Sequence, residues 1–185
     1  MTQQEALRIF RDTGALLTGH FKLASGRHSR EYLDKMQVLQ HPQQTEALCA
    51  GLADRWRNRG VEVVLGPAYG GMIVAYEVAR QLGVRAAFAV KQGAGFALRK
   101  ELPLQPGERV LVVEDVFTTG GSIKKVLALV KQAGAEPVGV GAWADRTGGK
   151  IDFGVPLEAL ISMEIESCDP AECLQCLAAE PLVEM

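Results

Sequence analysis

The sequence predicts one α/β domain built on a parallel, twisted β-sheet that is flanked by helices. The first reason is that short β-branched runs alternate with helical stretches after residue 60, which is typical of right-handed βαβ units and of a sheet covered on both faces. The second reason is size, because 185 residues are enough for one ordinary domain with a full core. The third reason is composition, since 48% hydrophobic and 23% charged residues are typical of a soluble globular protein.

Before the alternating region, the sequence predicts a helix, a polar stretch and a second helix. Thr2 and Glu5 have the spacing of a capping box, and Gly14 is a typical stop for the helix that they begin. Residues 18–34 are polar and rich in glycine, so turns with short strands are expected there. Pro42 suits the first turn of the next helix, which we expect to end near Gly60.

Within the alternating region, each strand is expected to end at the same edge of the sheet. The expected strands are residues 61–65, 85–90, 110–113, 137–144 and 157–163, and the expected helices are residues 73–82 and 122–133. Ligands of parallel α/β sheets bind at the carboxyl ends of the strands. The sequence therefore predicts a site formed by four segments, which are residues 66–71, 91–100, 114–122 and 145–149.

Charge and hydropathy limit the partners. The net charge of −2 gives no general basic surface for nucleic acid, although it is compatible with a local basic pocket for a phosphate. No run of about 18 apolar residues is present, and the N-terminus lacks the pattern of a secretion signal. We therefore expect a cytoplasmic protein with neither a membrane nor a nucleic-acid partner, in which the four cysteines are thiols.

The most informative segment is residues 110–122, with the sequence Val-Leu-Val-Val-Glu-Asp-Val-Phe-Thr-Thr-Gly-Gly-Ser. The apolar run predicts a buried strand, and Glu114 and Asp115 follow at its carboxyl end. Glycines and a helix N-terminus favour anion binding. Further hydrogen-bond donors are the hydroxyls of Thr118, Thr119 and Ser122. The acids can accept hydrogen bonds from ribose hydroxyls or face a hydrated Mg²⁺. The alternative is an ordinary βα turn, but this order of residues favours a sugar-phosphate site.

This segment resembles the motif for 5-phosphoribosyl 1-pyrophosphate (PRPP) in type I phosphoribosyltransferases, whose members act on different nucleobases. Three further segments resemble orotate phosphoribosyltransferases. They are the N-terminal hood segment at residues 19–29, the pyrophosphate loop at residues 66–71, and residues 144–149, where the family's arginine meets orotate. The tail, from Phe153 through Cys176, resembles a shorter bacterial and archaeal branch of that family. The resemblance therefore spans almost the whole chain.

The resemblance implies a type I phosphoribosyltransferase fold. A hood at about residues 1–40, together with the C-terminal tail, would accompany a core at about residues 43–165. The implied enzyme is a pentosyltransferase that joins orotate to the phosphoribosyl group of PRPP. It would yield orotidine 5′-monophosphate and pyrophosphate, in UMP (pyrimidine) biosynthesis. Mg²⁺ is expected to bind through PRPP without a direct protein ligand, and the family is expected to form a homodimer.

The resemblance also assigns residues to the substrates. The implied PRPP-binding residues are Lys91, Arg99, Lys100, Glu114, Asp115, Val116, Phe117, Thr118, Thr119, Gly120, Gly121 and Ser122, with Ala68 and Tyr69 in the pyrophosphate loop. The expected catalytic residues among them are Lys91, Lys100 and Asp115. Orotate is expected to bind Thr118 and Arg146, because a guanidinium can pair with a carboxylate through two parallel bonds. Two alternatives stay open, a structural pair of Arg146 with Asp145 and a packing role for Tyr69.

Residues 91–100 contain two glycines without clear periodicity, so we expect a mobile loop. As a lid, this loop would bring its cations to the pyrophosphate of PRPP. In the resembling family it reaches the active site of the neighbouring subunit. The alternative is a solvated basic loop at the surface.

Two positions depart from the pattern of better-known family members. Those proteins carry a lysine just before the Ser-Gly of the hood, where this chain has Ala24, and another in the pyrophosphate loop, where this chain has Gly70. Both lysines usually touch substrate. Their absence raises the question of which cations take their place.

Other patterns carry less weight. A zinc site could be formed by Cys168, Cys173 and Cys176, with Cys49 far upstream. A single Cys-x-x-Cys favours free thiols near the surface instead. His28 is interpreted either as a residue near the base pocket or as a turn histidine. Residues 139–144 match the letters of a dinucleotide fingerprint, but we expect them to continue a strand without the required helix.

Two alternative functions stay open. One is a phosphoribosyltransferase for another nucleobase, such as a purine or uracil, and the other is a PRPP-binding regulator without catalysis. The hood segment and Arg146 favour orotate, because they suit a carboxylated pyrimidine. A regulator would be expected to carry a fused DNA-binding domain, for which this chain has no room.

Overall fold

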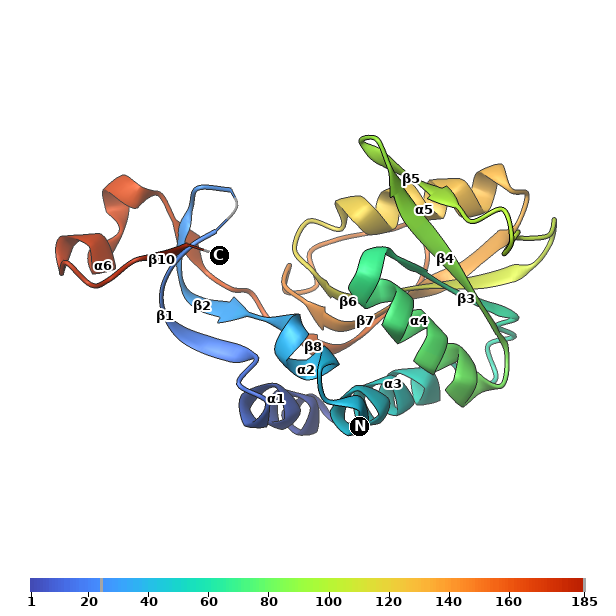
Figure 1. The fold of residues 1–185 in the computed structure, drawn as a ribbon, viewed down its shortest axis with the longest axis horizontal. Coiled ribbons are helices and arrows are strands. Elements are labelled where there is room, and N and C mark those ends of the chain that lie inside the picture. The colour runs from blue at the N-terminus through green and yellow to red at the C-terminus, as the bar shows by residue number, and fades with distance from the viewer. Residues whose placement is uncertain (24, 185) are drawn as a thin grey trace.

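The computed structural model describes residues 1–23 and 25–184. A large six-stranded sheet is flanked by helices, and a small four-stranded sheet lies beside it (Figure 1). The large sheet has the strand order β5-β4-β3-β6-β7-β8, in which all neighbours are parallel except the edge pair β4–β5. The predicted α/β class, with a parallel sheet between helices, is therefore confirmed.

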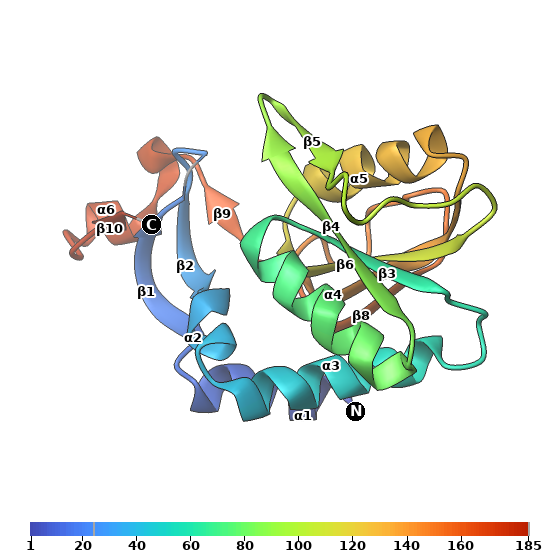
Figure 2. The same cartoon turned by 45° about the vertical axis from the view of Figure 1, so that its right-hand side comes forward.

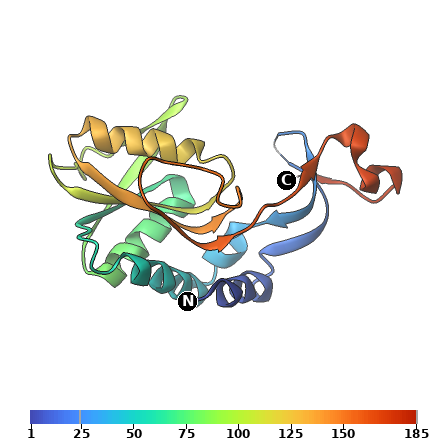
Figure 3. The same cartoon turned by 180° about the vertical axis from the view of Figure 1, so that it is seen from behind.

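The elements of the large sheet follow the predicted alternation. The strands are β3 (Val63–Pro67), β4 (Arg85–Gln92), β5 (Gly95–Leu98), β6 (Arg109–Phe117), β7 (Glu136–Asp145) and β8 (Leu157–Ser162). The helices packed on it are α3 (Pro42–Trp56), α4 (Ala68–Leu82) and α5 (Gly121–Gln132). In the view from behind, α5 lies on one side of the sheet, and α3 and α4 lie on the other (Figure 3).

Both faces of the sheet are apolar because successive side chains of a strand point to opposite faces. In β6, Val110 and Val112 pack with α5, whereas Leu111 and Val113 pack with α3 and α4. All four side chains are fully buried. The helix α1 (Gln3–Asp12) packs into the same apolar cluster as Leu111 and Val113. Its predicted capping box between Thr2 and Glu5 is present.

The small sheet combines the two ends of the chain. It is formed by β1 (Leu16–Lys22), β2 (His28–Leu33), β9 (Ser167–Cys168) and β10 (Val183–Glu184), in the order β10-β1-β2-β9. In the C-terminal tail, the segment between β9 and β10 contains the 3-10 turn η1 (Pro170–Glu172) and the short helix α6 (Leu174–Leu177). We call residues 16–33 and 166–184 the hood. Figure 2 shows it beside the large sheet, with the helix α2 (Lys35–Leu39) between them.

Four predicted boundaries were wrong. The helix α4 begins at Ala68, so most of the expected loop at residues 66–71 is a helical turn. It fits against β3 because Gly66 has no side chain, and a Cβ there would lie 1.9 Å from the Gly71 carbonyl oxygen. The expected mobile loop at residues 91–100 is instead a hairpin of β4 and β5 that turns at Gly93. The helix α3 ends at Trp56, and α2 was not predicted.

The glycine-rich residues 139–144 continue strand β7, as predicted. Gly139 is explained by packing, because a Cβ there would lie 2.0 Å from the ring of Trp56. Within the described residues, no helix has the length and apolar character needed to cross a membrane.

Candidate active site

Three of the four predicted site segments, residues 66–71, 114–122 and 145–149, meet at the edge of the large sheet where β3, β6 and β7 end. In Figure 1 the N-terminal end of α5 is the end nearer the hood. The first turn of α4, the loop before α5 and the loop after β7 all begin at this edge. It is the edge at which parallel α/β sheets bind ligands.

Glu114 and Asp115 lie inside β6 rather than after it, because the strand continues to Phe117. Both are buried, and Asp115 is fully so. The Oδ1 atom of Asp115 accepts hydrogen bonds from Lys35 Nζ, at 2.9 Å, and from the Val116 amide. Its Oδ2 atom is buried without a partner in the described part of the chain. A buried acceptor without a partner is costly, and this oxygen is enclosed against Gly70 in the first turn of α4.

The two carboxyl groups have perturbed acidities. Burial, together with the neighbouring Asp115 charge, raises the pKa of Glu114 to about 8. Burial also raises the pKa of Asp115, although Lys35 acts in the opposite direction. Adjacent acids whose pKa values are raised by burial are typical of binding and catalytic sites.

Lys35 was not predicted as a site residue. It is the first residue of α2, directly after the Asp34 cap, and it brings a cation from the hood side to Asp115. Burial alone would lower the pKa of Lys35, but the charges of Asp115 and Glu114 hold it above the usual value. No sequence pattern marks this lysine, because its role depends on how β2 and α2 approach the large sheet.

Gly70 explains how the acid and the first turn of α4 come so close. A Cβ at Gly70 would lie 1.7 Å from Asp115 Oδ2. This is the position at which better-known family members carry a lysine. Here the carboxylate of Asp115 occupies the space that a side chain at residue 70 would need. The cation that contacts this carboxylate is Lys35 instead. Ala24, the other departure, lies outside the described residues.

The predicted phosphate loop has the features of an anion site. Thr118, Thr119 and Ser122 are exposed, and α5 begins without a side-chain cap, which leaves its first N–H groups free for a ligand. Gly120 has a φ of 68°, which favours glycine. A Cβ there would also lie 2.3 Å from Ile151. The loop therefore needs glycine both for its backbone and for packing.

Arg146 lies where the sheet edge meets the loop after β7. Its Nε atom is buried and has no hydrogen-bond partner within residues 1–23 and 25–184. The alternative of a pair with Asp145 is wrong, because Asp145 accepts hydrogen bonds from Thr147 and Gly149. Burial lowers the pKa of Arg146. A partly buried guanidinium without a partner suits a planar anion such as a carboxylate.

The predicted lid residues are not gathered around the acids. Lys91, Arg99 and Lys100 are exposed on or beside the β4–β5 hairpin, and Arg99 pairs with Glu101 at 3.2 Å. The turn of the hairpin is held near the start of α5, because Lys125 Nζ donates to the Ala94 carbonyl at 2.7 Å. These three cations are therefore exposed, and within residues 1–23 and 25–184 none of them pairs with Glu114 or Asp115.

The predicted pyrophosphate residues are held in an unusual backbone. Ala68 has a φ of 48°, a left-handed conformation that costs a non-glycine residue about 1–3 kcal/mol. Such strain is concentrated at ligand-binding turns. Tyr69 is 85% exposed, so a packing role within this chain is excluded.

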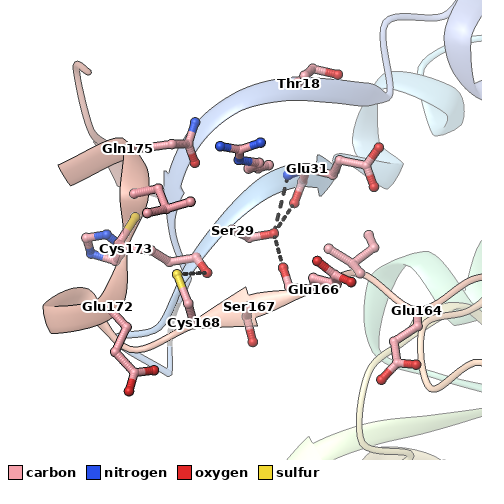
Figure 4. Close-up of a pocket in the computed structure, with 14 residues that line it drawn as sticks. Thr18, Ser29, Glu31, Glu164, Glu166, Ser167, Cys168, Glu172, Cys173 and Gln175 are labelled. Carbon is pink, nitrogen blue, oxygen red and sulfur yellow. Dashed lines mark hydrogen bonds between the residues drawn. The ribbon is translucent and has the colours of Figure 1, made fainter. Parts of the chain in front are cut away.

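A further groove lies on the hood. It has a volume of about 900 Å³ and runs between β2 and the tail (Figure 4). Ser29 bridges the two segments, because its hydroxyl donates toward the carbonyls of Glu31 and Glu166. None of the residues that line this groove belongs to the phosphate loop. The predicted PRPP residues are therefore not part of the lining of this groove.

The histidines and cysteines are also distributed differently from the prediction. His28 lies in β2, with its side chain against His20 and Cys176, so it is neither in the base pocket nor in a turn. Cys49 is buried in α3 against the Val74 carbonyl, far from the tail cysteines in the fold. Cys173 is buried rather than near the surface.

A buried strand that carries two adjacent acids near its carboxyl end, followed by a threonine- and glycine-rich loop at a helix N-terminus, defines a phosphoribosyltransferase. A family model described as "Phosphoribosyl transferase domain" matches residues 36–152. Full-length comparison narrows this class, because an orotate phosphoribosyltransferase of Desulforamulus reducens is 51% identical over 100% of this chain and 96% of its own length. The chain belongs to the orotate phosphoribosyltransferase family.

Solved structures agree with this assignment at the level of the fold. The crystal structure of orotate phosphoribosyltransferase from Aeropyrum pernix has a TM-score of 0.71 and 27% identity, over 83% of this chain and 91% of that one. Adenine phosphoribosyltransferase from Rhodothermus marinus also superposes, with a TM-score of 0.67 and 22% identity over 85% of this chain and 98% of that one. The fold is therefore shared by enzymes for different bases, and side chains must select the base.

Proposed function

We infer that the protein transfers the 5-phosphoribosyl group of PRPP to N1 of orotate and releases pyrophosphate. The observation that carries this inference is the buried Nε of Arg146, which has no partner among the described residues and lies in the loop beside the phosphate loop. Orotate brings a carboxylate that can accept from this group. Purines and uracil carry no carboxylate, so they would leave the guanidinium without an ionic partner.

The remaining residues divide between the ribose and the phosphates. The 5-phosphate is held by the N–H groups at the start of α5 and by the hydroxyls of Thr118, Thr119 and Ser122. Glu114 and Asp115 accept hydrogen bonds from the ribose hydroxyls, and of the two Glu114 is the more accessible. The first turn of α4, with Ala68 and Tyr69, faces the pyrophosphate.

The hard carboxylate oxygens of Glu114 and Asp115 also fit a hydrated Mg²⁺ that arrives with PRPP. When bound, Mg²⁺ neutralises charge on the leaving pyrophosphate. The chain's own part is to hold the ribose in line with orotate N1 and to keep Lys35 beside Asp115. As the C1–pyrophosphate bond breaks and the N1–C1 bond forms, positive charge develops on the ribose and negative charge on the leaving pyrophosphate. The fixed charges of the site stabilise both, and no covalent enzyme intermediate is needed.

A base screen tests the assignment. Purified protein with PRPP and Mg²⁺ is given orotate, uracil, hypoxanthine, guanine or adenine, and the loss of each base is followed. We expect consumption of orotate alone, with orotidine 5′-monophosphate and pyrophosphate as products. Turnover of another base without turnover of orotate would contradict the assignment. PRPP binding without any turnover would instead identify a regulator.

We further propose that the protein is a homodimer whose interface includes the exposed face of α2 and α4. Large side chains that are strongly exposed there are Met36 (55%), Tyr69 (85%), Ile73 (44%) and Tyr76 (63%). Beside them lies a hollow of about 410 Å³ that is lined by Leu39, Ile73, Tyr76 and Phe88, among others. A contiguous apolar patch of this kind marks an interaction surface. A two-fold axis would place the same patch of a second copy against it.

The dimer gives the distant lid cations a role. The exposed Lys91 and Lys100 would act on the site of the neighbouring subunit rather than on their own. Mixing inactive Lys91→Ala and Asp115→Asn chains tests this arrangement. Subunit exchange should produce one site with both defects and one with neither, so that activity returns. No recovery after demonstrated exchange would mean that the lid and the acids act within one chain.

The cytoplasmic location and the division into hood and core stay predictions.

A further inference from the structure

A second cluster of chemically active side chains lies in the hood. Two histidines on neighbouring strands, His20 of β1 and His28 of β2, face Cys173 and Cys176 of the tail. One ligand atom from each of the four residues lies within 4.8 Å of all the others. The cluster thus joins three segments that are separated by up to about 150 residues, and none of its members belongs to the sheet edge described above.

The spacing within the cluster is that of a tetrahedral metal site. Zn–N bonds of about 2.0–2.1 Å and Zn–S bonds of about 2.3 Å place the ligand atoms about 3.3–3.8 Å apart. Cys173 Sγ lies 3.4 Å and Cys176 Sγ 3.7 Å from His20 Nε2. Cys176 Sγ lies 3.3 Å from His28 Nδ1. The two ring nitrogens, 2.9 Å apart, need to widen by about 0.4 Å to match the tetrahedron.

Hydrogen bonding around the cluster orients the ligands. The Nδ1 atom of His20 lies 3.0 Å from the Glu180 carbonyl oxygen, which can only accept. The proton of the neutral ring is therefore on Nδ1, and Nε2 presents its lone pair to the cluster. Histidine ligands of zinc typically donate their other N–H to a carbonyl or carboxylate in this way. Gln175, between the two cysteines, ties the tail to β1 by donating to the Gly19 carbonyl at 3.0 Å.

The hood needs such a cross-link because it has little apolar core. Within residues 166–184, the only buried side chains are Cys173 and Gln175, whereas Leu174 and Leu177 are 66% and 78% exposed. No residue of that range belongs to either hydrophobic cluster of the large sheet. Small modules without a core commonly obtain their stability from a metal or from disulfides.

We propose that His20, His28, Cys173 and Cys176 bind one structural zinc ion that fixes the C-terminal tail to the β1–β2 hairpin. Two imidazoles and two thiolates favour zinc over Mg²⁺ or Ca²⁺, which prefer oxygen. Four protein ligands leave no position open for substrate, so the site is structural. Binding converts the two thiols to thiolates and releases their protons to solvent. The partly exposed Cys176 gives the ion a path of entry.

The first test is metal content. The chain is purified without a polyhistidine tag, dialysed, and assayed by plasma mass spectrometry, with about one zinc per chain expected. Replacing zinc with cobalt chloride gives a reading that does not depend on any variant. We expect the d–d bands of tetrahedral Co²⁺ together with a thiolate-to-cobalt charge-transfer band. A spectrum of octahedral cobalt, or no binding, contradicts the proposal.

Matched variants test the ligand set. Cys176→Ser should abolish stoichiometric zinc, while Cys168→Ser should retain it. Cys168 is a good control because it lies on the same tail, with its Sγ 3.8 Å from the His28 carbonyl oxygen and outside the four-atom cluster. Figure 4 shows Cys168 and Cys173 near each other at the groove. Loss of zinc in Cys168→Ser with retention in Cys176→Ser would overturn the assigned ligands.

A third measurement separates zinc from the two metal-free alternatives. With zinc bound, a chelator should release two protected thiols and make residues 166–184 sensitive to limited proteolysis, while the large sheet stays folded by circular dichroism. A Cys173–Cys176 disulfide, seen as a loss of two hydrogens by mass, would overturn the proposal. So would a tail that resists protease equally with and without chelator, because hydrogen bonds alone would then hold the cluster.

Discussion

The large sheet and the hood are stabilised by different means. The sheet has an apolar cluster on each face, in which β-branched and leucine side chains from the central strands are fully buried. The hood has exposed leucines in its tail and a cluster of sulfur and imidazole groups where a hydrophobic core would be. The comparison teaches that the large sheet is stabilised by burial of apolar surface, whereas the hood depends on a few specific contacts.

The active site combines these two regions. The acids and the phosphate loop belong to the large sheet and are held by its packing. Lys35 arrives through the strand and helix that leave the hood. Because Lys35 follows the hood strand β2 closely in the chain and contacts Asp115 at 2.9 Å, a change in the position of the hood can affect the charge of the site. The following predictions test this division of roles.

The largest effect is expected from a cavity in the large sheet. Leu111→Ala should lower the free energy of unfolding by about 2–5 kcal/mol, because Leu111 is fully buried in β6. Leu177→Ala, in the hood, should change it by less than about 0.5 kcal/mol, because that side chain is exposed. Chemical denaturation followed by tryptophan fluorescence measures both. Similar losses in the two variants would remove the proposed difference between the regions.

A change at the acid should affect catalysis without affecting the sheet. Asp115→Asn is expected to cut turnover by roughly a hundredfold, the size typical of one lost catalytic group. The amide keeps the shape of the side chain but loses the charge that faces Lys35 and the substrate. Steady-state kinetics with circular dichroism as a control for folding test this. Unchanged kinetics would leave the acids as structural residues of β6.

The parts of the fold and of the site differ in how far the sequence alone could predict them. The strands and helices of the large sheet were predictable, because apolar periodicity and terminal glycines are local signals. The phosphate loop was predictable, because one contiguous segment carries all of its chemistry. The hairpin β4–β5 was not predictable, because Gly93 indicated a loop. The pairing of β5 depends on its register with β4, which is not a local signal. Lys35 was missed, and His20 and His28 were not joined to the candidate zinc ligands Cys173 and Cys176, because these residues meet only in three dimensions.

The base-selecting residue is expected to show a smaller effect than the acid. Arg146→Lys retains a positive charge but loses the planar fork, so the KM for orotate should rise by about 10- to 30-fold while that for PRPP stays nearly constant. The matched control is Arg57→Lys, at a surface pair with Asp54. An equal rise in both KM values would place Arg146 on the phosphates rather than on the base.

The hood side of the site is tested by Lys35→Ala. Loss of one charge-assisted hydrogen bond to Asp115 should raise the KM for PRPP by about tenfold, and Lys35→Arg should restore part of it. Lys22→Ala is the control, since Lys22 is a hood lysine that pairs with the exposed Glu184. If Lys35→Ala is silent while Asp115→Asn is not, the acid acts without help from the hood.

The smallest effect concerns the pH dependence of stability, and it originates in the large sheet alone. In the folded protein, burial and the Asp115 charge raise the pKa of Glu114 to about 8, above the ordinary value of 4.5. The folded state then holds a proton that the unfolded state has released. A raised carboxyl pKa of this kind contributes stability that is complete below pH 4.5 and is lost as pH rises through about 8.

The free energy of unfolding of the substrate-free protein should therefore fall by about 1–2 kcal/mol more in the wild type than in Glu114→Gln between pH 7 and pH 8.5. The glutamine stays neutral and removes this dependence. Because both proteins keep the hood histidines and cysteines, any pH dependence of the hood cancels in the difference. Denaturation curves at the two pH values give the result. Parallel curves for the two proteins would show that Glu114 is already ionised at neutral pH. In that case the carboxylate would need no proton loss before it accepts the ribose hydroxyls.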